Sequence, residues 1–382
     1  MNSKINKKPS QYSLLEIDTI EDGNPHVRMV ADSRCPGATI SPSSHSLWNL
    51  LLLCLPVLAA ILLLALPARG YAQVPSKKPG SLEKRVYDIE KEVVRITAKT
   101  DIYTTDHLTD SLKLCEKKVS LSKDDNRERF EREFFQFLEN KGLLVIITKR
   151  YLKFYSMISN EIQKAGMPPD LIYLAINESY LNPRAVSKAN AAGLWQFIKE
   201  TGKREGLYIN EHLDDRYNIK KATRSALAHL KRLYAEFGDW FIAMAAYNAG
   251  AGRLREAIEN QQTSDFFELS LPEETERYIF RIVAIKEIIT DRERLGITLE
   301  EKDLYKPVIV TEISLELEQE THVNVLAKCA DSPYRTFRNL NLHLRKYRLP
   351  KGTYAINVPY DKKEIFLRKL KNYPFVRVIG ED

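Results

Sequence analysis

One glutamate in this chain follows an almost wholly apolar segment, a setting that can turn a carboxyl group into a proton donor. Residues 171–176 read LIYLAI, and Glu178 comes two positions later. A helix that is apolar on all sides is a buried helix, and burial raises the pKa of a carboxyl group. Glu178 is therefore predicted to donate a proton to a leaving oxygen near neutral pH. The simpler interpretation of an isolated glutamate at a helix end is that it points into water.

Three polar motifs follow Glu178 at wide intervals. They read AAGLWQF at 191–197, AAYNAG at 245–250 and ETERY at 274–278. Gln196 lies among apolar neighbours, so its amide requires a hydrogen-bond partner. The second motif ends another apolar helix, and its glycine allows a turn with positive φ. Two buried helices whose polar ends converge would form a cleft, which favours an active site over a solvated helix end.

Taken in order with Glu178-Ser179, these motifs resemble the lytic transglycosylases of the soluble-lytic-transglycosylase (SLT) type, and closely the membrane-bound lytic murein transglycosylase D subfamily. The resemblance covers roughly residues 165–292. It implies a mainly helical, lysozyme-like catalytic domain that cleaves the β-1,4 bond between N-acetylmuramic acid and N-acetylglucosamine in peptidoglycan. Most relatives carry methionine where this chain has Trp195, although the D-type subfamily tolerates tryptophan there.

The same resemblance implies the roles of individual residues. Glu178 would be the single catalytic acid and base. Five residues would bind or orient around it: Ser187 and Gln196 along the sugar cleft, Tyr247 and Asn248 near the acid, and Tyr278 beside Glu178. Taken alone, a tyrosine at this position would more often be a half-buried aromatic with a wet hydroxyl.

No second carboxylate appears in a motif comparable to that of Glu178. Asp170 lies two turns earlier on the same predicted helix, and Asp214, Asp215 and Asp239 are in polar contexts that predict helix caps. Most glycosidases use two carboxylates. With one, the nucleophile would be the 6-hydroxyl of the muramoyl sugar, and Glu178 would act first as acid and then as base. The expected product has a 1,6-anhydromuramoyl end.

Local signals predict the elements that position these motifs. Pro168 and Pro169 before Asp170 predict a helix start near Asp170, and Asn182-Pro183 predicts its end. In the next motif Gly193 permits a close helix approach. The aromatics Trp195 and Phe197 are either core or cleft residues.

Flanking regions complete the predicted architecture. A Pro- and Lys-rich linker is predicted from Val74 to Ser81, followed by a helical lead-in that reaches residue 164. The lead-in has apolar stripes at helical spacing at 86–96, 130–138 and 147–162, and a loop is predicted near 101–110. Residues 305–362 predict a small β-α-α-β module: strands at 308–310 and 354–359, and helices at 323–329 and 334–340. This order resembles a diverged LysM glycan-binding module. A structural cap is the other interpretation.

An apolar segment near the N-terminus predicts an envelope location. Leu47–Leu66 has about the 20 apolar residues that span a bilayer, so it is either a membrane segment or a long signal sequence. Small residues resemble a signal-peptidase site, with cleavage after Ala72. Residues 1–46 lack a hydrophobic period and are predicted to be disordered. The catalytic domain is thus expected in the periplasm of a bacterial cell, either membrane-anchored or released.

Composition excludes several other classes of function. The net charge of +7 is modest, and no basic block is interleaved with aromatics, so nucleic acid is not an expected partner. Cys115 and Cys329 are far apart and lack metal-ligand spacing, and no nucleotide loop, zinc motif or Ser/His/Asp signature appears. No cofactor or metal is therefore expected. Two rivals to a lytic transglycosylase remain: a lysozyme-like hydrolase, and a non-catalytic peptidoglycan-binding envelope protein.

Overall fold

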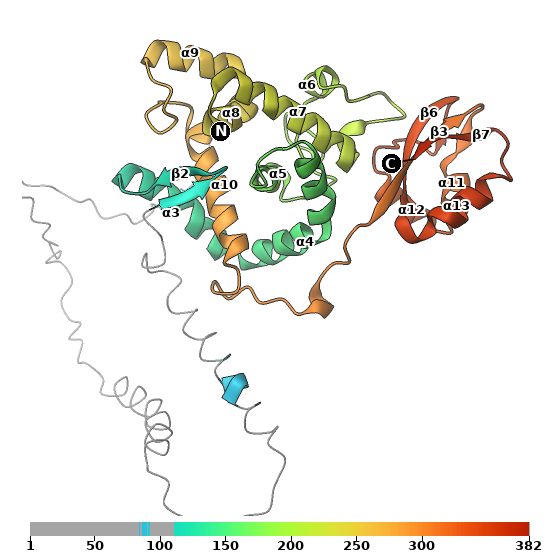
Figure 1. Cartoon of the computed structure of the whole chain (residues 1–382), viewed down its shortest axis with the longest axis horizontal. Coiled ribbons are helices and arrows are strands. Elements are labelled where there is room, and N and C mark those ends of the chain that lie inside the picture. The colour runs from blue at the N-terminus through green and yellow to red at the C-terminus, as the bar shows by residue number, and fades with distance from the viewer. Residues whose placement is uncertain (1–83, 85, 90, 92–110, 382) are drawn as a thin grey trace, which may run out of the picture. The chain divides into compact units, whose positions relative to one another are not determined.

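The computed structural model describes residues 84, 86–89, 91 and 111–381 (Figure 1). The predicted apolar segment Leu47–Leu66, the cleavage site after Ala72, the disordered residues 1–46, the linker 74–81 and the loop at 101–110 lie outside this part of the chain. Of the helix predicted at 86–96, residues 86–89 and 91 are helical. Within the described part, none of the helices combines the length and the hydropathy that crossing a bilayer requires.

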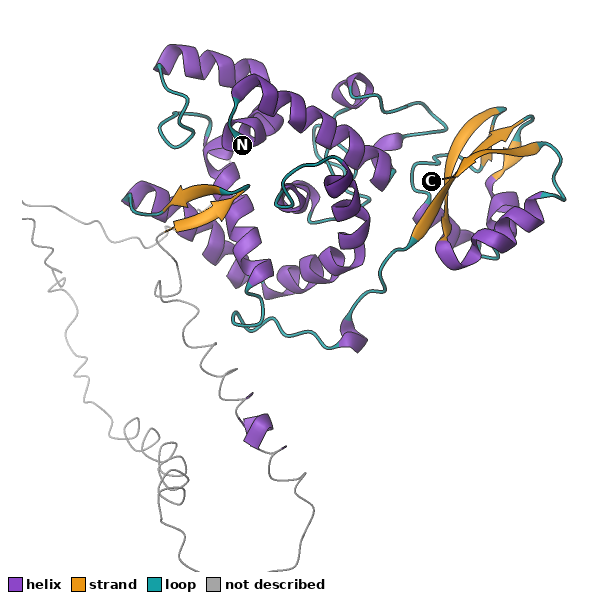
Figure 2. Cartoon of the chain, in the orientation of Figure 1, coloured by secondary structure: helices purple, strands orange, loops and turns teal. Residues whose placement is uncertain are grey.

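The region that carries the motifs is built of helices, which confirms the predicted mainly helical class. Figure 1 shows α5 surrounded by α4, α7, α8 and α10, and Figure 2 shows how little strand this region contains. The elements are α3 (Asp124–Glu139), α4 (Lys141–Lys164), α5 (Leu171–Ser179), α6 (Lys199–Arg204), η4 (Asp215–Tyr217), α7 (Ile219–Phe237), α8 (Trp240–Ala249), α9 (Ala251–Gln261) and α10 (Glu273–Thr290), followed by η5 (Glu301–Asp303).

The lead-in is not wholly helical, because a β-hairpin precedes α3. Strands β1 (Ser111–Leu114) and β2 (Lys117–Ser120) pair antiparallel. Cys115 and Glu116 join them with φ of 51° and 62°, and a two-residue hairpin turn of this type requires positive φ at both positions. Cys115 and Cys329 are both free and buried, so they do not form a disulfide with each other.

Helix α5 is buried as its apolar sequence predicts. Its residues Leu171, Leu174, Ala175 and Ile176 have no exposed surface. Burial of each large side chain contributes roughly 1.5–3 kcal/mol relative to exposure. The core of α8 is equally inaccessible to solvent, with residues 241–246 at most 1% exposed. Two inaccessible helices therefore hold the polar residues at their C-terminal ends in place.

The ends of the helices follow the predictions with two differences. Asp239 accepts from Phe241 N at 2.7 Å and caps α8, and Asp214 caps η4. The predicted cap at Asp215 is wrong, because its carboxylate binds Tyr208 N and Lys221 Nζ instead. Asp170 lies at the predicted start of α5, and its carboxylate accepts from Cys115 N and Lys286 Nζ.

The second difference is the end of α5, which comes before the predicted stop at Asn182-Pro183. Tyr180 has φ of 51° and follows the last helical residue, Ser179. Its N–H donates to Ile176 O at 2.7 Å, which closes the helix in the left-handed conformation. The helix therefore ends one residue after Glu178, and a turn follows it directly.

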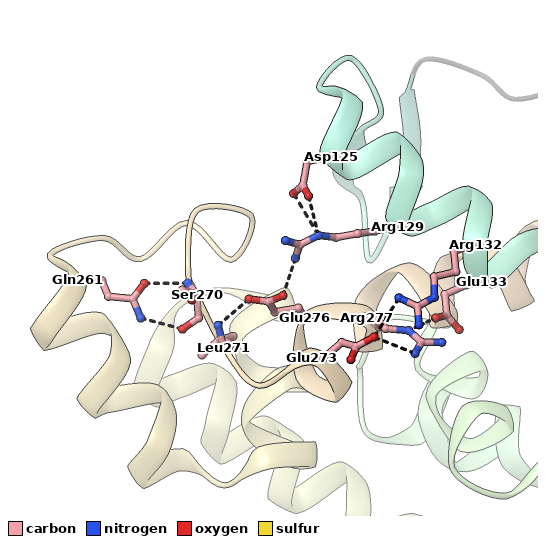
Figure 3. A network of polar contacts seen from close by, with 10 residues as sticks. All are labelled: Asp125, Arg129, Arg132, Glu133, Gln261, Ser270, Leu271, Glu273, Glu276 and Arg277. Carbon is pink, nitrogen blue, oxygen red and sulfur yellow. Dashed lines mark hydrogen bonds and ion pairs between the residues drawn. The ribbon is translucent and has the colours of Figure 1, made fainter. Parts of the chain in front are cut away.

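Ion pairs join α3 to the first turns of α10, as Figure 3 shows. Arg129 binds Glu276 at 3.1 Å, and Arg277 binds Glu133. Glu276 also accepts from Leu271 N at 2.8 Å. Glu276 and Arg277 of the ETERY motif therefore fix α10 against α3.

The C-terminal module contains the predicted helices and strands and five elements beyond the prediction. Helices α11 (Val323–Cys329) and α12 (Tyr334–Leu340) lie between strands β3 (Val310–Leu317) and β6 (Gly352–Pro359), with the short pair β4 (Thr321–His322) and β5 (Arg348–Leu349). The first strand begins at Val310 rather than 308. After η6 (Tyr360–Lys362), α13 (Lys363–Leu370) and β7 (Val376–Glu381) extend the module past residue 362. Its main sheet is antiparallel in the order β6-β3-β7.

The module also contacts the helical region. Asp214 N donates to His343 O at 2.8 Å, and Arg345 N donates to His212 O at 2.7 Å. Leu213 is only 5% exposed and belongs to the apolar core of the module. Removal of the module would therefore expose a leucine and break backbone hydrogen bonds, as expected for a structural cap.

Candidate active site

A cleft of about 1040 Å³ brings the predicted site residues together. All six predicted residues line it, and they come from α5, α8, α10 and the loop between α5 and α6: Glu178, Ser187, Gln196, Tyr247, Asn248 and Tyr278. They span a hundred positions of the sequence. Their shared location is thus an outcome of the packing of these helices around α5.

Glu178 is held by a hydrogen bond across two helices. Tyr278 of α10 donates its hydroxyl to Glu178 Oε1. Tyr278 is 2% exposed, so the interpretation of a half-buried aromatic with a wet hydroxyl is wrong. Burial raises the pKa of Tyr278 well above its ordinary value, as does the neighbouring Glu178, which keeps the hydroxyl protonated and able to donate. The tyrosine therefore fixes the orientation of the Glu178 carboxyl group.

The environment raises the pKa of Glu178 to about 7. Burial against the apolar end of α5 is the largest cause, and the nearby Glu274 adds to it. The hydrogen bond from Tyr278 and the charge of Arg281 act in the opposite direction. A carboxyl with this pKa exchanges its proton readily near neutral pH, as a group that acts as acid and then as base must.

Tyr247 and Asn248 lie at the C-terminal end of α8 and tie it to neighbouring segments. Tyr247 donates its hydroxyl to Trp195 O at 2.7 Å, and Asn248 Oδ1 accepts from Thr275 Oγ1 at 3.3 Å. The ring of Phe197 lies 6.0 Å from that of Tyr247. These contacts fix the end of α8 against the segment that carries Gln196 and against α10.

The loop that carries Ser187 and Gln196 is shaped by its own side chains. Gln196 has φ of 47°, and its Nε2 donates to Gly193 O at 2.8 Å and to Ala185 O at 3.4 Å. These carbonyls are the partners that its apolar surroundings required. Ser187 Oγ accepts from Ala191 N at 3.1 Å. Both side chains thus stabilise the cleft wall that they line.

The structure decides between the alternatives for the aromatics and the glycine of this motif. Trp195 is fully buried and donates from Nε1 to Thr223 Oγ1 at 2.9 Å, so it belongs to the core. Phe197 is 3% exposed and lines the cleft. A Cβ on Gly193 would lie 1.9 Å from Arg216 O, so the close approach is to η4 rather than to a long helix.

The cleft contains further carboxylates that the sequence analysis missed. Glu205, Glu236 and Glu274 line it as well as Glu178. Glu205 pairs with Arg232 and lies 3.1 Å from His229 Nδ1, and Glu236 binds Arg255 at 2.8 Å. Glu274 is exposed. None of the three follows an apolar run, which is why the signal that identified Glu178 did not find them.

Comparison with known proteins agrees with this geometry. Residues 156–270 match the family described as "Transglycosylase SLT domain". The chain contains an SLT domain. With the helices described above, the match confirms the predicted lysozyme-like fold class.

Named relatives support the same assignment. The chain is 34% identical over 209 residues to membrane-bound lytic murein transglycosylase D of Escherichia coli, a match that covers 53% of this chain and 45% of that protein. It is 36% identical over 124 residues to peptidoglycan transglycosylase gp16 of Escherichia phage T7, covering 31% of this chain and 9% of that protein. The chain thus spans about half the length of the transglycosylase D relative.

A solved structure with a weaker likeness is the 70 kDa soluble lytic transglycosylase of Escherichia coli. The match covers 66% of this chain and 43% of that protein at 15% identity, with a TM-score of 0.34. A likeness at that TM-score adds nothing to the assignment of the fold.

Proposed function

We propose that this protein is a peptidoglycan lytic transglycosylase, which cleaves the β-1,4 bond between N-acetylmuramic acid and N-acetylglucosamine. The observation that carries the proposal is Glu178, which ends the apolar helix α5 in a large cleft, bound by Tyr278 and with its pKa raised to about 7. The similarity to proteins named for this activity supports it.

The proposed reaction uses one carboxyl group twice. Protonated Glu178 donates its proton to the glycosidic oxygen as the bond from that oxygen to the anomeric carbon breaks. The 6-hydroxyl oxygen of the muramoyl sugar then bonds to the anomeric carbon and gives its proton to the Glu178 carboxylate. Tyr278 stabilises that carboxylate between the two steps, because it donates a hydrogen bond to Oε1. Glu178 ends protonated, and no water is consumed.

A lysozyme-like hydrolase is the second candidate, and the additional carboxylates of the cleft are the observation in its favour. A hydrolase that inverts the anomeric centre needs a second carboxylate as base on the far side of the sugar ring. Glu205 is compensated by Arg232 and His229, and Glu274 is exposed to solvent. The side chain of Glu205 is only 7% exposed, but its carboxylate is already paired, and Glu274 is solvated, so the transglycosylase reaction is the better fit.

The proposal extends to location and domain roles. Peptidoglycan lies outside the cytoplasmic membrane, so the catalytic domain is placed in the periplasm, attached through Leu47–Leu66 or released after Ala72. The catalytic domain is assigned to residues 165–292. The module that begins near residue 305 is assigned a LysM-like role in glycan binding in addition to its packing on the helical region.

Analysis of the products separates the two candidate reactions. Digestion of purified cell wall is expected to yield fragments that end in 1,6-anhydromuramic acid. These fragments are lighter by one water than hydrolysis products and do not react with borohydride, as mass spectrometry before and after reduction would show. Reducible muramic acid ends would instead establish a hydrolase. Loss of such ends in the Glu205→Gln protein would then identify Glu205 as its base.

The hydrogen bond between Tyr278 and Glu178 predicts a shift in pH dependence. Tyr278→Phe removes a contact that lowers the pKa of Glu178, so burial should raise that pKa above about 7. The acid must be protonated to act. Activity that the parent loses as the pH rises through this pKa should therefore persist to higher pH in the variant. The measurement is kcat/KM against pH for both proteins, and an unmoved alkaline limb would contradict the assigned contact.

A further inference from the structure

A second groove, of about 1010 Å³, lies between the helical region and the C-terminal module. Its walls come from α4, the loop after α5, and α12 with the loop that follows it. None of its lining residues is acidic. Seven are cationic: Arg150, Lys153, Arg184, Arg335, Arg338, Arg345 and Lys346.

The positive charge of this groove is almost uncompensated. Of the seven cations, Lys346 alone forms an ion pair with a carboxylate in the described part of the chain, with Glu211 at 4.0 Å. Arg184 donates to Asn339 Oδ1 at 2.7 Å, and Arg338 donates to Lys346 O at 3.3 Å. These neutral acceptors fix the guanidinium groups without neutralising them. Burial lowers the pKa of Lys153 and of Arg338, and neighbouring cations lower both further.

Two buried polar atoms in the same groove have no hydrogen-bond partner. They are the Tyr334 hydroxyl and Asn357 Oδ1. Asn357 is 7% exposed, and its Nδ2 donates to Leu340 O at 3.0 Å. The unpaired Oδ1 is an amide oxygen, which can only accept a hydrogen bond. The groove therefore presents cations for an anion together with an acceptor for an N–H group. A peptide with side-chain carboxylates offers both, whereas a phosphate polymer offers acceptors alone.

The groove and the cleft are lined in part by the same short segment of the sequence. Arg184 lines the groove, while the carbonyl of the next residue, Ala185, accepts from Gln196 of the cleft. Arg184 also lies six residues after Glu178, a separation of at most roughly 20 Å even for an extended chain. A polymer whose sugars occupy the cleft could thus place a charged branch in the groove.

We propose that this cationic groove binds the acidic stem peptide of peptidoglycan while the glycan strand occupies the cleft. This inference deepens the proposed function and rests on it for the identity of the polymer. Sugars without peptide would fill the cleft alone, so the groove would select strands that still carry their stem peptides. Binding there depends on charge and weakens as salt rises.

The test measures binding of the isolated stem peptide, free of sugar, to the full-length protein by calorimetry at low salt. The double variant Lys153→Gln, Arg335→Gln is expected to bind about tenfold more weakly, as the loss of two partly exposed ion pairs implies. A matched control, Lys231→Gln with Arg253→Gln, removes the same charge from exposed positions on α7 and α9 outside both sites. It should bind the peptide as the parent does, and equal melting temperatures would show that all three proteins are folded.

The outcomes separate this inference from the proposed function. Equal peptide affinity in the parent and the groove variant would overturn the inference, and so would charge-dependent binding of inorganic polyphosphate in place of the peptide. The peptide measurement involves no sugar and no cleavage. Failure of the parent to release soluble fragments from purified cell wall, whose strands carry stem peptides, would therefore refute the proposed function, and it would leave the result for the groove intact.

Discussion

Replacement of Glu178 by glutamine is expected to slow peptidoglycan cleavage by about 10²–10⁴-fold, the usual contribution of a general acid–base group. The amide fills the same volume beside Tyr278 but cannot transfer an acidic proton. The measurement is the rate of release of soluble fragments from purified cell wall. Glu256→Gln, at an exposed position on α9, is the matched control and should keep the parental rate. A folded Glu178→Gln protein that digests at the parental rate would remove Glu178 from the mechanism.

The same substitution should stabilise the protein at neutral and alkaline pH. The pKa of Glu178 is about 7 in the folded protein, above its ordinary value of 4.5. The folded state therefore binds the proton more tightly, and this contribution to stability is complete at low pH and is lost as the pH rises toward 7. Glutamine does not ionise. The variant should melt at a higher temperature than the parent at pH 8, with a smaller difference at pH 4.

Replacement of Glu133 by alanine is expected to lower the free energy of unfolding by about 3 kcal/mol, at the lower end of the range for breaking a buried ion pair. Glu133 is 1% exposed and accepts from Arg277 and, at 2.8 Å, from Arg281. Its loss leaves Arg281 without a carboxylate partner in the described part of the chain and leaves Arg277 with Glu273 alone, at 3.5 Å. These arginines are partly exposed and can recover some hydration, which keeps the cost at that lower end.

Urea denaturation of the parent and the variant would measure this effect. Glu128→Ala, on an exposed face of α3, is the matched control and should change stability by less than about 0.5 kcal/mol. A similarly small change for Glu133→Ala would show that the ion pairs between α3 and α10 contribute little to the free energy of unfolding. A large change would support the role of α3 as the support on which α10 is fixed.

The sequence predicted the elements that local signals encode. Proline and aspartate marked the start of α5, apolar residues on all sides marked α5 and α8 as buried, and the order of local patterns between two strands gave α11 and α12. The same local reasoning placed the end of α5 too late, because the left-handed turn at Tyr180 has no glycine to announce it. It also missed β7, a strand with mostly exposed residues that lacks an apolar alternation.

The sequence also indicated which residue could act as an acid, because Glu178 follows an apolar run whose burial raises the pKa of a carboxyl group. It determined the order of the motifs and the modest net charge. These properties depend on neighbours within a few positions, where periodicity, caps and composition act directly.

Only the tertiary structure decided what those residues face. It brought Tyr278 to Glu178 across a hundred positions, added Glu205 and Glu274 to the cleft, and sent Trp195 into the core. It also gathered the cations of the second groove from α4, the loop after α5 and the C-terminal module. Such contacts depend on how the helices and the sheet pack, and the sequence pattern of one segment does not specify which distant segment it will contact.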